Sequence, residues 1–291
     1  MGLGSNGYIP CGYREIAFVQ CNSRKGNEKC SRKVNIYTDY YTNQAREYAE
    51  HRPTYPEELY NFLAEHAPRN SRVLDCCTGS GQAALELAKR FPSVTAIDIN
   101  EEQINNAARH DNIEYRVASA EQSGMDANSI DLLTVATGIH WLDLEEFYSE
   151  ADRILTPQGI IAIWGYGATS ITPDIDAVLD QFTGVTLKDY WDDVLWFAWN
   201  NYKGLAFPFK TISDPGFRIT KELTLDALRN YLFTWTTYQR YITERGIDPY
   251  EEIRSDLEAA WGDPNQKRTV TWTITMKLGR ANLQPHGVTV R

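Results

Sequence analysis

Two carboxylates and two glycines stand where a nucleoside ligand could be held. Asp75 precedes Gly79 and Gly81, and Asp98 follows Gly81 by 17 residues. Glycine allows a ligand to approach the backbone closely because it has no Cβ. An acid at the end of a second strand can accept hydrogen bonds from both ribose hydroxyls. A carboxylate at Asp75 suits a cationic ligand, so the pattern predicts a site for a positively charged nucleoside.

The same loop leaves other interpretations open. Gly79-x-Gly81-x-x-Ala84 also matches a dinucleotide fingerprint, which would indicate an NAD-dependent oxidoreductase. Asp75 argues against that ligand, because a pyrophosphate favours a basic group, and this loop has none. Alternatively, Asp75 and Asp98 would only cap the helices that follow them.

A second candidate lies downstream, at His140 and Trp141. The imidazole of His140 is a candidate general base for a substrate that must lose a proton. The indole face of Trp141 can attract a cation. Both residues also have a plain structural alternative, in which His140 makes a structural hydrogen bond and Trp141 packs in a core. No pattern of metal ligands accompanies them, so no metal site is expected.

Alternating strands and helices must position these residues. Apolar runs predict five strands, over Arg72–Cys76, Val94–Ile97, Ile113–Val117, Ile130–Ala136 and Ile160–Trp164. The segments between them have helical patterns, over Gln82–Arg90, Glu101–Arg109 and Leu144–Leu155, and a turn is expected at Pro157–Gly159. This alternation predicts a doubly wound parallel sheet with helices on both faces, whose carboxyl edge carries the acids.

The alternation stops after Gly167. Residues 168–264 combine helical stretches with dense aromatics, and Arg268–Lys277 alternates as a strand does. We therefore expect an α/β fold with a Rossmann-like, mostly parallel seven-stranded sheet, an antiparallel C-terminal strand and an inserted helical cap. Phe209–Ile212 or Phe217–Ile219 is the candidate for one further edge strand. The expected domains are a flexible leader at 1–36, a core at 37–167 plus 265–291, and a substrate-binding cap at 168–264.

The charge and composition of the chain exclude some classes of binding partner and cellular location. The formal net charge of −10 disfavours nucleic acid and anionic membranes, which both attract basic proteins. The chain has no run of 18 apolar residues and no apolar N-terminal signal segment, so neither a membrane span nor secretion is expected. Its five cysteines fit no zinc pattern and are expected to be reduced. A cytoplasmic protein, monomeric or homodimeric, is expected. The aromatic cap suggests an enclosed pocket and so favours a small-molecule substrate, and a protein or tRNA acceptor is the alternative.

Several short motifs together resemble one enzyme family. They are Arg52-Pro53-Thr54-Tyr55-Pro56, the loop Asp75–Gly81, Asp98, Ser119-Ala120-Glu121, Thr137–Asp143 with its His140-Trp141 pair, Trp235–Gln239 and Trp272. In this order and spacing they resemble class I S-adenosylmethionine (SAM)-dependent methyltransferases of type 11, in the branch of the trans-aconitate methyltransferases. The family's first loop glycine is replaced here by Cys77, which raises a question about the loop geometry.

The resemblance implies SAM as the cofactor and S-adenosylhomocysteine as the product. It also implies that a set of residues contacts the cofactor: Tyr48 and Arg52 at the methionine carboxylate; Asp75, Thr78, Gly79, Gly81 and the carbonyl of Thr137 around the methionine; Asp98 at the ribose; and Ile99, Ala120 and Glu121 at the adenine.

The implied reaction is an in-line methyl transfer from a sulfonium, which needs alignment and a dry site more than activation. His140 and Trp141 are the candidate catalytic residues, and a carboxylate acceptor would need no base. The aromatic cluster at 191–209 would form either the cap's own core or a substrate cage, and Arg240 or Lys203 could pair with a carboxylate substrate. A protein that binds SAM without catalysis remains an alternative.

Overall fold

The computed structural model describes residues 51–68, 70–212 and 214–281. The predicted leader at 1–36 and the candidate residue Tyr48 therefore lie outside the described residues.

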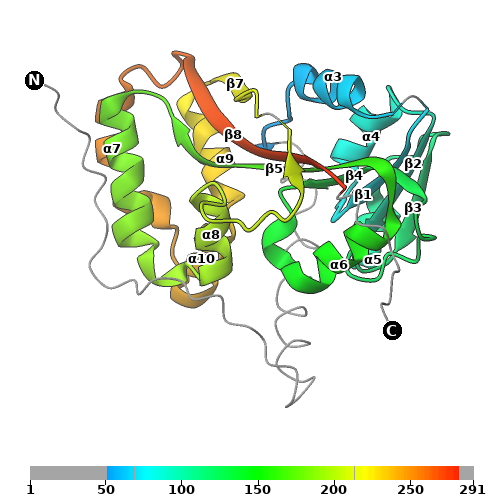
Figure 1. Ribbon diagram of the computed structural model, residues 1–291. Helices are drawn as coiled ribbons and strands as arrows, with labels where there is room; N and C mark the ends of the chain where they lie inside the picture. Colours follow the sequence, from blue (N-terminus) through cyan, green and yellow to red (C-terminus); the bar gives the residue numbers. More distant parts are fainter. Residues whose placement is uncertain (1–50, 69, 213, 282–291) are drawn as a thin grey trace, which may run out of the picture. The chain divides into compact units, whose positions relative to one another are not determined.

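Five parallel strands form one side of the sheet (Figure 1). They are β1 (Arg72–Cys76), β2 (Ser93–Asp98), β3 (Ile113–Val117), β4 (Ile130–Ala136) and β5 (Leu155–Ser170). They lie side by side in the order β3-β2-β1-β4-β5. The order reverses at β1, so the carboxyl ends of β1, β2 and β4 meet at a switch point, where ligands bind in open α/β sheets. The predicted class of fold is confirmed.

Three further strands extend the sheet beyond β5. They are β6 (Lys210–Thr211), β7 (Arg218–Leu223) and β8 (Arg268–Arg280). The strand β8 runs antiparallel to β5, as predicted, and both β6 and β7 pair with β8. The described sheet thus has eight strands instead of the seven expected, because both candidate edge segments join it. Each occupies a different stretch of the long strand β8.

Helices cover both faces of the sheet. The first part of the chain has α3 (Glu57–His66), α4 (Gln82–Ala88), α5 (Glu101–Asn106), the short η1 (Ile139–Trp141) and α6 (Leu144–Ile154). Polar side chains begin several of these helices: Asn100 accepts two amide hydrogen bonds at α5, and Asp143 does so at α6. The α3 and α4 residues Leu59 and Leu87 share one core with β1, and Phe147 of α6 belongs to a second core on the other face.

The predicted turn at Pro157–Gly159 is not a separate turn. It lies inside β5, where the register with β4 shifts between Ile130 and Leu132. Proline has no backbone N–H and cannot donate a hydrogen bond to a neighbouring strand. A strand can contain a proline where its pairing is irregular, as β5 does here.

The predicted cap contains most of the remaining helices. They are α7 (Pro173–Gln181), η2 (Phe182–Thr186), η3 (Lys188–Tyr190), α8 (Asp193–Trp199), α9 (Leu225–Phe233), α10 (Thr236–Arg245), η4 (Pro249–Glu252) and α11 (Arg254–Trp261). Buried residues of this region, such as Phe182, Tyr231 and Trp261, share one core cluster with Trp272 and Ile274 of β8. The cap helices therefore pack on the extended sheet and do not form a separate core. The predicted division into a cofactor-binding core and a substrate-binding cap stays a prediction.

Candidate active site

The carboxylate of Asp75, at the end of β1, is entirely buried. Both of its oxygens are occupied: the hydroxyls of Thr78 and Thr134 donate to Oδ2 and Oδ1, each at 2.6 Å. Burial raises the pKa of Asp75 to about 6, although the two hydroxyl hydrogen bonds act in the opposite direction. Asp75 thus holds the loop through Thr78. It would influence a bound ligand indirectly, by fixing the conformation of the loop that contacts the ligand.

Asp98 has a different environment at the end of β2. Its side chain is half-buried, and its oxygens accept the amides of Gly79 at 2.8 Å and Asn100 at 2.9 Å. Burial raises the pKa of Asp98, and these backbone hydrogen bonds partly offset the effect. A carboxylate accepts about four hydrogen bonds, so Asp98 retains capacity for ribose hydroxyls.

The capping interpretation of the two acids is wrong. The residue at the start of α4 is Gly81, and the side chain that caps α5 belongs to Asn100. The acids instead fasten the loop between β1 and α4: Asp75 holds the hydroxyl of Thr78, and Asp98 holds the amide of Gly79.

The two loop glycines have different physical roles. Both have a positive φ, of 55° at Gly79 and 84° at Gly81. A Cβ at Gly79 would meet only Oε1 of Gln103, at 3.9 Å, so the space beside this residue is open to a ligand. A Cβ at Gly81 would lie 2.2 Å from the hydroxyl of Tyr115. Gly81 is therefore required by the protein's own packing.

Cys77 stands where the family has glycine, and its backbone keeps the conformation that glycine favours. Its φ is 54°, in the left-handed region, and its side chain lies against Gly138. A Cβ built on Gly138 would be 2.4 Å from the Cβ of Cys77. Cys77 therefore fits at a left-handed position of the loop, because Gly138 supplies the space for its side chain.

This packing predicts a strong coupling between the two positions. Gly138→Ala is expected to destabilise the protein by about 2 kcal/mol, because two rigid Cβ atoms would overlap. Cys77→Gly alone should change stability little, and the double variant should recover most of the loss. Urea unfolding of the four proteins gives the coupling free energy, expected to be about 1–2 kcal/mol. Additive effects of the two changes would show that the residues do not share this space.

The predicted adenine side lies at the ends of β2 and β3. Ile99 is 58 % exposed, which is unusual for isoleucine and leaves an apolar face available, while Ala120 is buried. Glu121 is tied down, since Ser119 donates to its carboxylate and the amide of Asp143 donates to Oε1 at 3.0 Å. The turn at Ser119–Glu121 is thereby fastened to the segment that carries His140.

Thr137 directly follows β4 in a strained conformation. Its φ is 50°, rare for a β-branched residue, and such strain concentrates at functional sites. Two contacts hold it: its amide donates to the carbonyl of Trp164 at 2.7 Å, and its hydroxyl shares a short hydrogen bond with the hydroxyl of Tyr55. The ring of Tyr55 packs edge-on against Trp164.

Arg52 connects the beginning of the described chain to the predicted cap. Its guanidinium donates to the carbonyl of Thr234 at 3.0 Å and lies 5.5 Å from the ring centroid of Tyr231. Arg52 therefore links the first described residues to the predicted cap through a hydrogen bond and a ring contact. Its contact with the methionine carboxylate stays a prediction.

His140 and Trp141 lie together on η1, with ring centroids 4.6 Å apart. Both side chains are half-buried. The Nδ1 atom of His140 is 3.2 Å from the hydroxyl of Tyr202. Burial lowers the pKa of His140 to about 3, against the opposing effect of Asp192, so the imidazole is neutral at physiological pH.

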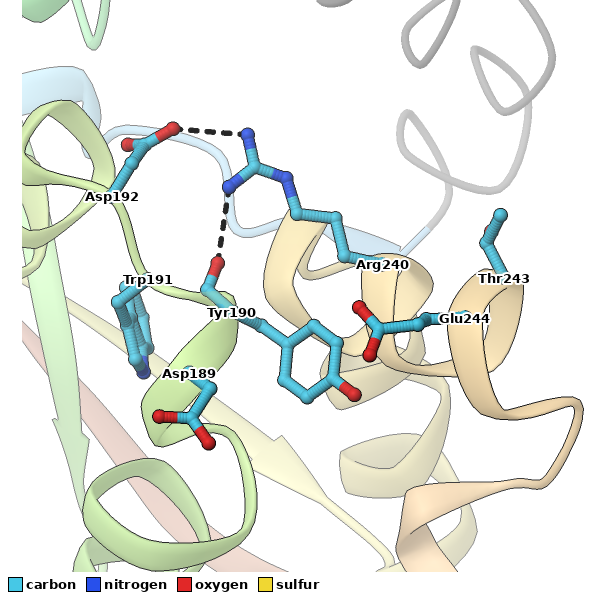
Figure 2. A pocket seen from close by; sticks show the side chains of 7 residues that line it. All are labelled: Asp189, Tyr190, Trp191, Asp192, Arg240, Thr243 and Glu244. Atoms are coloured by element: carbon cyan, nitrogen blue, oxygen red, sulfur yellow. Dashed lines mark hydrogen bonds and ion pairs between the residues drawn. The ribbon is translucent and has the colours of Figure 1, made fainter.

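A pocket of about 420 Å³ opens beside Asp192, between η3 and α10 (Figure 2). It is lined by Asp189, Tyr190, Trp191, Asp192, Arg240, Thr243 and Glu244. The Arg240 guanidinium donates to Asp192 at 3.0 Å and to the carbonyl of Tyr190 at 3.0 Å. Because Asp192 balances its charge, Arg240 is less suited to a carboxylate substrate than the sequence suggested.

The aromatic cluster packs mainly against itself. Trp191 contacts both Trp196 and Trp199, and Trp199 contacts Trp235, with ring centroids 4.8–5.6 Å apart. These contacts favour the interpretation as cap packing. The tryptophans at 191, 196 and 199 nevertheless remain half-exposed, so an aromatic surface is left beside the pocket.

Sequence reasoning missed three contacts: Thr134 at Asp75, the hydroxyl of Tyr55 at Thr137, and Tyr202 at His140. The first follows from strand register, since Asp75 pairs directly with Thr134 across β1 and β4. No local sequence signal gives that register.

In the described part of the chain, no group of three potential ligands could hold a metal ion, and none of the helices has the length and apolar character to span a membrane.

Comparison with known proteins identifies relatives. The sequence profile of the type 11 methyltransferase domain family matches residues 74–163. A Dictyostelium discoideum protein named as a methyltransferase is 31 % identical over 229 residues, which is 77 % of this chain and 87 % of the relative. The C-methyltransferase UbiE of Rickettsia prowazekii, which acts in ubiquinone and menaquinone biosynthesis, is 38 % identical over 112 residues, or 34 % of this chain and 45 % of that protein.

A solved structure is similar over nearly its whole length. A protein of Anaeromyxobacter dehalogenans, described as a type II methyltransferase, is 38 % identical and has a TM-score of 0.74. The match covers 79 % of this chain and 98 % of that protein.

Proposed function

This chain belongs to the class I SAM-dependent methyltransferases, and we propose that it transfers a methyl group from SAM to a small-molecule acceptor. The observation that carries the proposal is the loop between β1 and α4. There the half-buried carboxylate of Asp98 lies beside the open space at Gly79, and the exposed side chain of Ile99 follows directly.

These residues fit the chemistry of SAM. The Asp98 carboxylate suits the ribose hydroxyls, and the apolar face of Ile99 suits the adenine. The open space at Gly79 leaves room for the methionine portion. When bound, SAM supplies an activated methyl group on a positively charged sulfur. A deeply buried acid at Asp75 and an acid at Asp98 give this end of the sheet a negative bias, which favours a cation over a pyrophosphate.

The protein's own part in the reaction is to bind and orient. Thr137 is held in its strained conformation by Tyr55 and Trp164, which fixes the direction of its carbonyl. The paired rings of His140 and Trp141 lie on the segment that follows Thr137. They are the candidate groups for holding the acceptor, and Trp141 offers an aromatic face to a cation. Alignment of this kind supplies much of the rate enhancement of a displacement reaction.

The acceptor class remains a proposal. The aromatic surface around Trp191 and Trp199 and the nearby pocket favour a small molecule, and a carboxylic acid is one candidate class. The trans-aconitate branch, the cytoplasmic location and the monomeric or dimeric state likewise stay predictions.

Thermal unfolding with added ligands tests the cofactor. SAM or S-adenosylhomocysteine at 100 times its Kd should stabilise the protein by about 2.7 kcal/mol. For a chain of this size this corresponds to a rise in Tm of about 5 °C. NAD(H) should give no rise. A rise with the nicotinamide alone would overturn the proposal, and SAM binding without turnover across an acceptor screen would support a non-catalytic SAM-binding protein.

A further inference from the structure

The partner of His140 comes from a distant part of the chain. Tyr202 lies 62 residues away, after α8, and its hydroxyl approaches Nδ1 of His140 to 3.2 Å. The helix α8 packs against both η1 and β5, which brings the two residues together. The other ring nitrogen, Nε2, has no hydrogen-bond partner among the described residues, and the side chain is half-buried. Nε2 is therefore the atom that a bound acceptor could meet.

The position of the Tyr202 hydroxyl is closely determined. The side chain is only 2 % exposed, and its ring lies on Gly165, where a Cβ would come within 2.5 Å of it. Phe197 packs edge-on against the same ring at 5.5 Å. The backbone at Tyr202 has a φ of 53°, and Asn201 before it has 54°. Two consecutive non-glycine residues in the left-handed region are costly, and the surrounding packing holds them there.

The direction of this hydrogen bond follows from the chemistry of the two groups. A neutral imidazole nitrogen is a strong acceptor and a phenol is a strong donor, whereas the reverse pairing is weaker. The imidazole is neutral because burial lowers the pKa of His140. Asp192 is the charged group that opposes this shift, and Arg240 offsets its charge. The hydrogen bond made by one ring nitrogen decides which nitrogen carries the hydrogen.

We propose that Tyr202 is a positioning residue that donates to Nδ1 of His140 and so holds the imidazole in the tautomer with hydrogen on Nε2. His140 then donates a hydrogen bond to the methyl acceptor and does not remove a proton from it. A His140 that donates suits an acceptor whose nucleophilic atom is already free of its proton at neutral pH. This consequence for the acceptor rests on the proposed methyltransferase function, whereas the tautomer itself does not.

The tautomer can be measured without knowing the acceptor. The protein is labelled with ¹⁵N-histidine, and the ring nitrogens are observed by NMR at pH 7; His140→Gln identifies the signals among the five histidines. We expect His140 Nε2 in the range of a protonated nitrogen and Nδ1 in the range of an unprotonated one. Tyr202→Phe should redistribute the hydrogen between the two nitrogens. A wild-type signal with hydrogen on Nδ1 would overturn the proposal.

Two variants serve as controls. Tyr148→Phe removes a tyrosine hydroxyl that donates to the carbonyl of Ala206 at 2.7 Å, and it should leave the tautomer unchanged. If Tyr202→Phe does not fold, Gly165→Ala displaces the Tyr202 ring while retaining its hydroxyl, and it should also alter the signals. An unaltered tautomer in every folded variant would refute the positioning role. A Tm rise with SAM in the same samples tests the cofactor separately, so the two proposals can fail independently.

Discussion

Asp98→Asn is expected to weaken SAM binding about 100-fold, or ~2.8 kcal/mol, without unfolding the protein. The carboxylate of Asp98 accepts the amides of Gly79 and Asn100 and would also accept the ribose hydroxyls. An amide has one oxygen and one donor group in place of two acceptors, so at least one charged hydrogen bond is lost and a donor faces donors. Titration calorimetry with S-adenosylhomocysteine gives the Kd of each protein.

Asp131→Asn is the matched control for this measurement. Asp131 is also an acid of the sheet whose oxygens accept an amide and a hydroxyl, from Arg72 at 2.9 Å and Thr156 at 3.1 Å. It lies near the amino end of β4, however, whereas Asp98 ends β2. Its replacement should affect stability and leave cofactor binding intact. Equal losses of binding in the two variants would indicate a general disturbance of the sheet and contradict the assigned role of Asp98.

The largest expected effect on stability belongs to Gly167→Ala. A Cβ at Gly167 would lie 2.2 Å from the carbonyl oxygen of Trp199 and 3.0 Å from Oδ1 of Asn201. The first obstacle is backbone, which cannot rotate away, so β5 and the end of α8 would have to separate. We expect a loss of about 3 kcal/mol in the free energy of unfolding. Because Tyr202 follows this contact, the displacement should also disturb its hydrogen bond to His140.

Gly184→Ala provides the comparison. Gly184 lies in the same predicted cap, and a Cβ there would meet no atom within 4 Å. Urea unfolding should place this variant within about 0.5 kcal/mol of the wild type. If both glycine variants lost the same stability, the tight packing of α8 against β5 would not be the cause.

The candidate site could be proposed from sequence because its main residues are adjacent to strand ends. Asp75 and Asp98 follow apolar runs, and parallel strands bring their carboxyl ends to one edge. The glycines were predictable for the same reason, since their spacing belongs to a single loop. The separate roles of Gly79 and Gly81 were not, because the contact that occupies the space at Gly81 comes from Tyr115 on β3.

The strands that extend the sheet beyond β5 were also only partly predictable from sequence. The pattern of β8 was recognisable, but both β6 and β7 pair with it, where one edge strand was expected. Strand β6 has only two residues, so it has no detectable alternation of its own. Its pairing depends on the length of β8, which offers separate stretches to the two strands.

The sequence by itself determined the order of the first five strands and the helices between them, and the placement of the loop glycines and of the acid at the end of β2, because these depend on local pattern and spacing. The tertiary structure alone decided how those groups are partnered: Thr134 at Asp75, Gly138 beside Cys77, and Tyr202 at His140. Each partner is far away in the chain and is brought close by strand register or helix packing. The physical reason is that hydrogen bonds and steric contacts depend on distances of a few ångströms, which spacing along one segment does not specify.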